Sequence, residues 1–329
     1  MAEDEDVRVG RLKHGRPDMR TARTMTREDM PLAGMRLGVF GKGGAGKSTT
    51  TVLLADALQE RGYSVLVLDA DSTNVGLARA LGIPRDPDPL LDYFGGMVFS
   101  GGLVTCPVDD PTPLEGGTVS IHEMPDRFVG RRDGLRLMVA GKMGGLGPGA
   151  GCDGPIAKIA RDLVVEDLEP DHVVLVDFKA GFEDSARGAL TSLDWALVTV
   201  DPTVAAVQMA VHLSEMVAKI RAGVPPATQH LLERGDLVQL AIRLFREARI
   251  RRVVAVLNRV ADAPTEAYLR TALGEASVPV VGGFGADHSI EEQWLRGYPV
   301  GSEELRREAS ALVASLESVV GETLAAPTA

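Results

Sequence analysis

Residues 41–50 read Gly-Lys-Gly-Gly-Ala-Gly-Lys-Ser-Thr-Thr, and this run constrains the fold more than any other part of the chain. The apolar stretch before it, residues 35–40, is typical of a strand, and the apolar spacing over residues 47–61 is typical of a helix. A glycine-rich loop that ends in Gly-Lys-Ser between a strand and a helix predicts a phosphate-binding loop. Its backbone N–H groups and the helix N-terminus would bind the phosphates.

The residue types in this loop predict individual nucleotide contacts. Lys47 is expected to reach the β- and γ-phosphates, and Ser48 to place its hydroxyl group on Mg²⁺. ATP and Mg²⁺ are therefore the expected cofactors. We assign the contacts with the nucleotide to the loop and the first helical turn, which comprise Gly43, Gly44, Ala45, Gly46, Lys47, Ser48 and Thr49.

Two other strand-like runs end in carboxylates. Residues 65–68 lead into Asp69-Ala-Asp71, and residues 173–176 lead into Asp177. Because ligands bind at the carboxyl ends of parallel strands, we expect these side chains beside the phosphates. Asp177 has the place of the Walker B aspartate and Asp69 of a second Mg²⁺-organising carboxylate. The alternative for the first pair is an acidic turn that caps the next helix.

Strand-like and helix-like segments alternate along the chain. The strand-like runs are continuously apolar, as in strands that are buried on both faces of a parallel sheet. The pattern predicts an α/β fold, doubly wound around a mostly parallel sheet with helices on both faces. The expected strands span 35–40, 64–69, 135–140, 172–177, 195–200, 252–257 and 278–282, and the expected helices span 47–61, 155–167, 203–221 and 303–320.

The organisation predicted is a flexible N-terminal arm, residues 1–34, followed by one P-loop ATPase domain, residues 35–329. Two insertions interrupt the alternation. The first, about 84–134, is rich in Pro and Gly with one strand at 117–123, and the second, about 223–250, holds a helix near 236–249. Seven of the fourteen residues from 141 to 154 are glycine, which predicts close backbone approach or movement.

Composition limits the classes of function. The net charge of −11 argues against bulk binding to nucleic acid or to an anionic membrane. No apolar run approaches the roughly 18 residues of a spanning helix. The N-terminus carries charges where a signal peptide needs an apolar core. Two cysteines, Cys106 and Cys152, cannot form a disulfide framework, so we expect a cytoplasmic protein.

The extra lysine at the start of the loop, Lys42, resembles the deviant phosphate loop of the MinD/ParA/nitrogenase iron-protein class of ATPases. The resemblance implies a homodimer on ATP binding, in which Lys42 is a catalytic residue that contacts the partner's nucleotide. It implies that Asp71 orients the attacking water. It also implies that Asn258, which follows the strand at 253–257, hydrogen-bonds the adenine edge. The alternatives are a solvated charge for Lys42 and a turn role for Asn258.

Within that class the chain is similar to the CooC-type ATPases, which mature carbon monoxide dehydrogenase by delivering nickel. The similarity includes the strand that ends at Lys142, the glycine loop that reaches Cys152, and the run from Asp177 to Glu183. It implies a client metalloenzyme and a transition metal, Ni²⁺ or Zn²⁺, at Cys152 in the dimer. The family carries Cys-x-Cys there, whereas this chain has Cys152-Asp153-Gly154, and Lys179 takes the place of a glutamate. Asp153 is a candidate substitute ligand, and a thiol that binds no metal is the alternative for Cys152.

Two other functions remain open. A ParA/MinD-like positioning ATPase would bind DNA or a partner protein in its ATP state, and five arginines between Arg243 and Arg252 favour it. A solvated helix face is the alternative for that cluster. An iron–sulfur reductase component would need both Cys106 and Cys152.

Overall fold

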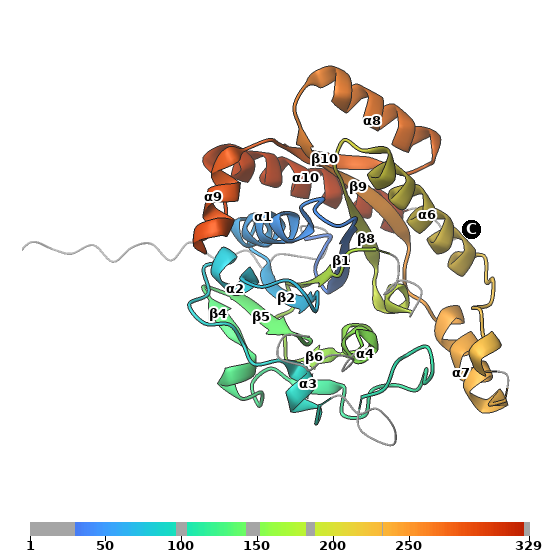
Figure 1. The fold of residues 1–329 in the computed structure, drawn as a ribbon. Coiled ribbons are helices and arrows are strands. Elements are labelled where there is room, and N and C mark those ends of the chain that lie inside the picture. The colour runs from blue at the N-terminus through green and yellow to red at the C-terminus, as the bar shows by residue number, and fades with distance from the viewer. Residues whose placement is uncertain (1–29, 97–103, 143–151, 182–187, 232, 326–329) are drawn as a thin grey trace, which may run out of the picture.

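The computed structural model describes residues 30–96, 104–142, 152–181, 188–231 and 233–325. An eight-stranded sheet lies at its centre, with the strand order β10-β9-β8-β1-β7-β2-β5-β4 (Figure 1). Every pairing in it is parallel except that of β4 with β5. The strands are β1 (Met35–Gly41), β2 (Ser64–Ala70), β4 (Gly130–Arg132), β5 (Leu135–Val139), β7 (His172–Phe178), β8 (Trp195–Val200), β9 (Arg252–Val260) and β10 (Val280–Gly285).

Helices cover both faces of the sheet, as a doubly wound fold requires (Figure 1). On one face, α1, α9 and α10 share a core with odd-numbered residues of β1 and β2. On the other face, α4, α6 and α8 pack over a second core. The helices of the described chain are α1 (Lys47–Glu60), α2 (Leu77–Ala80), α3 (Leu90–Tyr93), α4 (Gly154–Asp162), α6 (Val204–Arg221), α7 (Gly235–Arg246), α8 (Ala263–Glu275), α9 (His288–Arg296) and α10 (Glu303–Ala325).

The register of the central strands brings the acidic strand ends together. Strand β1 lies between β7 and β8, and β7 also pairs with β2. Asp177 on β7 is the register partner of Val39 on one side and of Asp69 on the other. All seven residues of β1 are buried, so the loop that follows it leaves the sheet from a rigid support.

The seven expected strands of the sheet are confirmed, and one expected helix is too long. The helix expected at 155–167 ends at Asp162, because Leu163 takes an extended conformation with ψ of 119°. Residues Val164–Glu166 instead form β6, which pairs with β3 (Thr118–Ser120) in a separate two-stranded sheet. The strand expected at 117–123 is therefore present but shorter, and α7 accounts for the helix expected near 236–249.

The packed domain begins before residue 35, where the sequence suggests the end of an arm. Met30 and Leu32 are buried in the core beneath α1 and α10. The backbone N–H of Leu32 donates to the Tyr63 hydroxyl group at 3.4 Å. Residues 1–29 of the expected arm lie outside the described residues. In the part of the chain that the structure describes, none of the helices combines the length and the apolar character needed to span a membrane.

Candidate nucleotide-binding site

The glycine loop between β1 and α1 borders a cavity of about 630 Å³. Gly44 and Gly46 have positive φ angles of 74° and 95°, in the region where only glycine is unstrained. Gly46 is also the N-cap of α1, and a Cβ atom there would lie 2.1 Å from the Asn258 amide nitrogen. The loop therefore needs glycine at this position for its backbone turn and for the close approach of β9. Lys47, Ser48 and Thr49 line the cavity beside it.

Ser48 connects the loop to two other motifs. Its hydroxyl group donates to Asp177 Oδ2 at 2.7 Å, and the Asn74 amide donates to Ser48 Oγ at 2.8 Å. The structure thus joins the first turn of α1 to the end of β7 and to the turn after β2. This contact is compatible with the Mg²⁺ roles expected for Ser48 and Asp177, which stay predictions.

The carboxylates of Asp69, Asp71 and Asp177 form a buried acidic cluster beside Ser48. Burial, with the nearby Asp69 charge, raises the pKa of Asp177 to about 7, and burial raises the pKa of Asp69 to about 6. Asp177 Oδ1 is buried and accepts no hydrogen bond from the described residues. A buried carboxylate oxygen without a partner, next to a serine hydroxyl group, fits the oxygen ligands that Mg²⁺ prefers.

Lys142 occupies one side of this cluster, and the sequence interpretation gave it no role. Its ammonium group donates to Asp69 Oδ2 at 2.6 Å and to the Asp71 carbonyl oxygen at 2.6 Å. The carboxylate of Asp69 is thus paired with a cation, whereas Asp177 Oδ1 has no hydrogen-bond partner among the described residues. Lys142 follows β5 just as Asp177 follows the apolar run of β7. The rule that ligands bind at the carboxyl ends of parallel strands could therefore have placed Lys142 in the site as well.

Asp71 lines the cavity and at the same time closes a turn. Its Oδ1 atom accepts from the backbone N–H groups of Thr73 and Asn74 and from the Thr73 hydroxyl group. The turn of the alternative interpretation is therefore present, but Asp71 does not cap the next helix, because the N-cap of α2 is Gly76. The carboxylate is held in place before any ligand arrives.

Lys42 forms an ion pair within the chain. Its ammonium group lies 3.0 Å from Asp201 Oδ2, and Arg259 lies 3.2 Å from the same oxygen atom. Arg259 also donates to the Gly44 carbonyl oxygen at 2.6 Å, from a backbone with φ of 55°. Asp201 follows β8 and Arg259 lies near the end of β9, and the sequence interpretation gave neither residue a role. Lys42 is thus paired with a buried carboxylate while its own side chain stays 30% exposed, and its contact with a partner's nucleotide stays a prediction.

Asn258 contacts the loop itself in this structure. Its amide donates to the Ala45 carbonyl oxygen at 2.7 Å, and its side chain is buried at the edge of the cavity. Trp294 lies across the cavity and donates to the Thr49 hydroxyl group at 3.0 Å. The cavity lining combines apolar side chains with the Asn258 amide and with charged groups, and the adenine contact of Asn258 stays a prediction.

The structure brings Cys152 to the nucleotide motifs through its neighbour Asp153. The Asp153 carboxylate accepts from the Ser72 hydroxyl group and forms an ion pair with Lys179. Asp153 is therefore already engaged and makes a poor substitute metal ligand. Cys152 is exposed and Cys106 is half-buried. Among the described residues, no three His, Cys, Asp or Glu side chains are placed so that they could hold one metal ion between them. Residues 143–151 and Glu183 lie outside the described part of the chain.

The arginine cluster lies on the surface around the end of α7. All its members are exposed, and Arg249 donates to the Ser192 carbonyl oxygen at 2.6 Å. This fits the solvated helix face at least as well as a binding surface. The members are Arg243, Arg246, Arg249, Arg251 and Arg252.

Comparison with known proteins places these features in a family. The family model for the CobQ/CobB/MinD/ParA nucleotide binding domain matches residues 39–300. An uncharacterised ATP-binding protein of Methanocaldococcus jannaschii is 31% identical over 188 residues, which cover 56% of this chain and 74% of that protein. The carbon monoxide dehydrogenase accessory protein CooC of Rhodospirillum rubrum is 28% identical over 180 residues, or 54% of this chain and 67% of CooC.

Solved structures with the same fold include two archaeal cell-division ATPases. MinD of Pyrococcus furiosus gives a TM-score of 0.53 at 19% identity and covers 87% of this chain and 99% of its own. MinD of Pyrococcus horikoshii, solved with Mg-ADP, gives a TM-score of 0.52 at 18% identity and covers 89% of this chain and 99% of its own. The likeness at these identities concerns the fold, and it extends over most of both chains.

Proposed function

The chain belongs to the CobQ/CobB/MinD/ParA nucleotide-binding family, and on that premise we propose that it is an ATP-hydrolysing dimeric switch that assists assembly of a metallocentre in a partner enzyme. The observation that carries the proposal is the contact between Ser48 and Asp177, whose second, buried carboxylate oxygen has no hydrogen-bond partner among the described residues. A Mg²⁺ ion bound there would neutralise charge on the phosphates.

The proposed hydrolytic roles follow from position. Lys47, at the first turn of α1, would bind the β- and γ-phosphates together with the loop N–H groups. Ser48 and Asp177 would hold Mg²⁺. Asp71, fixed by its turn at the cavity edge, would orient the attacking water towards the γ-phosphate. Asn258 and the wall near Trp294 would receive the adenine ring.

The proposed dimer depends on Lys42. In the single chain this lysine is paired with Asp201 and is not among the residues that line the cavity. When ATP is bound, we propose that Lys42 releases Asp201 and contacts the phosphates in a second copy. Hydrolysis would then be coupled to association, which is what a switch requires.

The metallocentre role is supported by the likeness to CooC and by the position of Cys152. CooC is an accessory protein of carbon monoxide dehydrogenase. In this chain an exposed thiol stands beside Asp153, which contacts the residues that follow Asp71 and Phe178. Thiolates are preferred ligands of Ni²⁺ and Zn²⁺. The client enzyme is therefore proposed to be a metalloenzyme.

The test combines two measurements on the purified protein under anaerobic conditions. Phosphate release from ATP measures hydrolysis, and light scattering with a slowly hydrolysed ATP analogue measures dimer formation. The proposal expects both, and it expects Lys47→Ala to abolish both. Hydrolysis without any change in mass would contradict the dimeric switch, and absence of hydrolysis would contradict the enzyme.

A positioning ATPase is the second candidate, because the arginine cluster around α7 is exposed. Its direct test is binding of duplex DNA at low salt with the ATP analogue. A double variant, Arg243→Ala with Arg246→Ala, should weaken that binding if the cluster is a DNA site. The net charge of −11 argues for the first candidate.

A further inference from the structure

A second cavity, of about 240 Å³, lies where the two insertions meet α4. The first insertion lines it with Pro107, Val108 and Pro111, and the second lines it from the loop before α7 and from α7 itself. His230 of that loop pairs through Nε2 with the Val108 carbonyl oxygen, so the insertions contact each other at the cavity. The second cavity shares no lining residue with the nucleotide cavity, and an inference about it stands apart from the proposed function.

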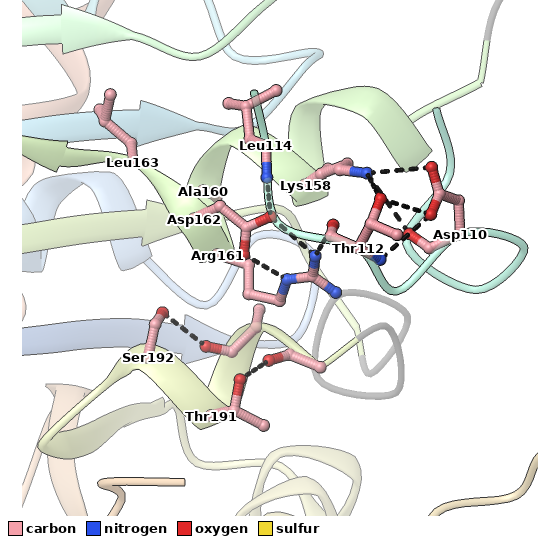
Figure 2. Close-up of polar contacts among 12 residues, drawn as sticks. Asp110, Thr112, Leu114, Lys158, Ala160, Arg161, Asp162, Leu163, Thr191 and Ser192 are labelled. Carbon is pink, nitrogen blue, oxygen red and sulfur yellow. Dashed lines mark hydrogen bonds and ion pairs between the residues drawn. The ribbon is translucent and has the colours of Figure 1, made fainter. Parts of the chain in front are cut away.

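Arg161 of α4 lines the second cavity and has one guanidinium nitrogen without a partner. Its Nε donates to Asp162 Oδ1 at 2.5 Å, and its Nη2 donates to Asp162 Oδ2 at 2.7 Å and to the Thr112 carbonyl oxygen at 3.1 Å. The remaining nitrogen, Nη1, is buried and has no hydrogen-bond partner among the described residues, and Figure 2 shows it pointing away from Asp162. A buried charged donor without an acceptor is unfavourable, so an acceptor that reaches it from the cavity gains a strong hydrogen bond.

The wall that carries Arg161 is fixed before any ligand arrives. Asp162, its ion-pair partner, also accepts from the Leu114 backbone N–H at 3.0 Å (Figure 2). On the other side, a Cβ atom on Gly188 would lie 3.6 Å from Arg161 Cδ, and the Thr191 hydroxyl group donates to the Gly188 carbonyl oxygen at 2.7 Å. The guanidinium group is therefore held in one place, and a ligand that binds it pays little to order the protein.

The end of α4 is also prepared for negative charge. The carbonyl oxygens at a helix C-terminus would repel an anion. Here Arg36 covers two of them, because its guanidinium group donates to the carbonyl oxygens of Ala160 and Leu163 at 2.7 and 3.2 Å. Burial, followed by the Arg249 charge, outweighs two nearby carboxylates and lowers the pKa of Arg36 to about 10. Additional negative charge beside Arg161 is therefore favourable.

We propose that the second cavity binds a small carboxylic acid with a short apolar chain, whose carboxylate accepts from Arg161 Nη1. One charged donor among apolar walls suits a carboxylate, whereas it is too little to compensate the doubly charged phosphate group of a nucleotide. The apolar residues of the lining include Pro107, Pro111, Met216, Pro226, Leu244 and Phe245.

The size of the second cavity and the burial of Arg161 define the ligand further. A volume of about 240 Å³ lies below the roughly 300–1,000 Å³ of sites for drug-sized ligands, so the cavity suits a smaller free acid. The Arg161 side chain is only 1% exposed, so a ligand meets it inside the cavity and not at the surface. Water is scarce there, which strengthens a charge-assisted hydrogen bond.

The experiment is a titration of the full-length protein with 4-fluorophenylacetate, followed by fluorine NMR of the probe. Wild type should bind the acid saturably, and it should bind the neutral 4-fluorophenylacetamide at least roughly tenfold more weakly, because the charge-assisted hydrogen bond is lost. Ala227→Trp places a large ring in the cavity from an exposed lining position and should abolish binding. Val224→Trp is the matched control, because Val224 lies in the same loop, is 49% exposed and does not line the cavity.

A double variant tests the role of the guanidinium group. Arg161→Gln with Asp162→Asn removes both members of the ion pair, so no uncompensated charge stays buried. This variant should bind the acid and the amide equally. Equal binding of the two probes to wild type, no saturable binding of the acid, or unchanged binding in Ala227→Trp would each overturn the proposal. The peptide Gly-Gly-Phe is the last arm, and displacement of the acid by the peptide at a lower concentration than by phenylacetate would overturn the free acid in favour of a protein chain end.

Discussion

The ammonium group of Lys42 lies 3.0 Å from the carboxylate of Asp201 in the same chain. Asp201 is buried and also pairs with Arg259, so one carboxylate balances two cations at the edge of the phosphate loop. The proposed dimer needs Lys42 in contact with a second chain, so this ion pair must break when the dimer forms. The free energy of the pair therefore opposes association.

Asp201→Asn should strengthen ATP-dependent dimerisation, because it releases Lys42 at no cost to the phosphate contacts. Lys42 is 30% exposed, so the effect is expected to be about 1 kcal/mol or less, which is up to roughly fivefold in the dissociation constant. Lys42→Ala should weaken dimerisation more than it weakens ATP binding. Analytical ultracentrifugation with the ATP analogue measures the dimerisation of both variants. Equal dimerisation constants for Asp201→Asn and Lys42→Ala would contradict the role of this ion pair.

Lys47→Ala should weaken ATP binding by at least about tenfold, because it removes a charged donor to the β- and γ-phosphates. Lys219→Ala, on the exposed surface of α6, is the control and should leave ATP affinity unchanged. Isothermal titration calorimetry with Mg-ATP gives the ATP dissociation constants of both variants. Wild-type affinity in Lys47→Ala would remove the loop from the nucleotide site.

Asp71→Asn should keep ATP affinity within a few-fold of wild type and reduce turnover by roughly 10²- to 10⁴-fold. The asparagine retains an oxygen atom for the turn with Thr73 and Asn74, so the loop should keep its shape. Single-turnover phosphate release is the measurement. If Asp71→Asn hydrolyses ATP at the wild-type rate, the water-orienting residue lies elsewhere.

Acid should selectively remove the contribution of Asp110 to stability. Burial alone would raise the pKa of this carboxyl group, but hydrogen bonds from Thr112 and Thr105 and the Lys158 charge lower it to about 2. An unfolded aspartate titrates near 3.9, so the stabilisation is complete above about pH 4 and is lost as the pH falls towards about 2. The difference in Tm between wild type and Asp110→Asn should therefore narrow over this range.

The control for this titration is Glu215→Gln, at an exposed position of α6. Its difference in Tm from wild type should be small. A difference between wild type and Asp110→Asn that stays constant from about pH 5 down to about pH 3 would contradict the linkage.

The sequence predicted the central sheet because its strands are buried on both faces. Continuous apolar runs such as residues 65–68 and 173–176 have few alternatives once a phosphate loop precedes them. The helix expected over residues 163–167 was wrong because the structure there depends on a distant segment. Val164 and Val165 extend the helical pattern of α4 locally, and they become a strand only because β3 offers a partner from a distant segment. Local pattern contains no information about that pairing.

The residues of the candidate site also fall into those that local motifs predict and those that only long-range contacts bring together. Lys47, Ser48 and Asp177 stand in motifs whose spacing is local, and they meet in the structure. Asp201, in contrast, forms ion pairs with Arg259 and Lys42, and Cys106 packs against Gly154. None of these pairs is close in the sequence. Such contacts join segments that are far apart in the sequence, so they depend on the order of the strands in the sheet. That order, in which β8 lies between β1 and β9, became known only from the structure.

The glycine-rich segment is fixed at both ends to the acidic edge of the sheet. Lys142 binds Asp69 at its start, and Asp153 binds Ser72 at its end. The distance that the chain must cover between these two residues is therefore set by the sheet, whereas the number of residues in between is not. Since closing a loop costs only about 0.6 kcal/mol more for each doubling of its length, insertions and deletions between Lys142 and Cys152 should be tolerated during evolution. Relatives can then differ in the length of this segment while keeping the same two attachment points.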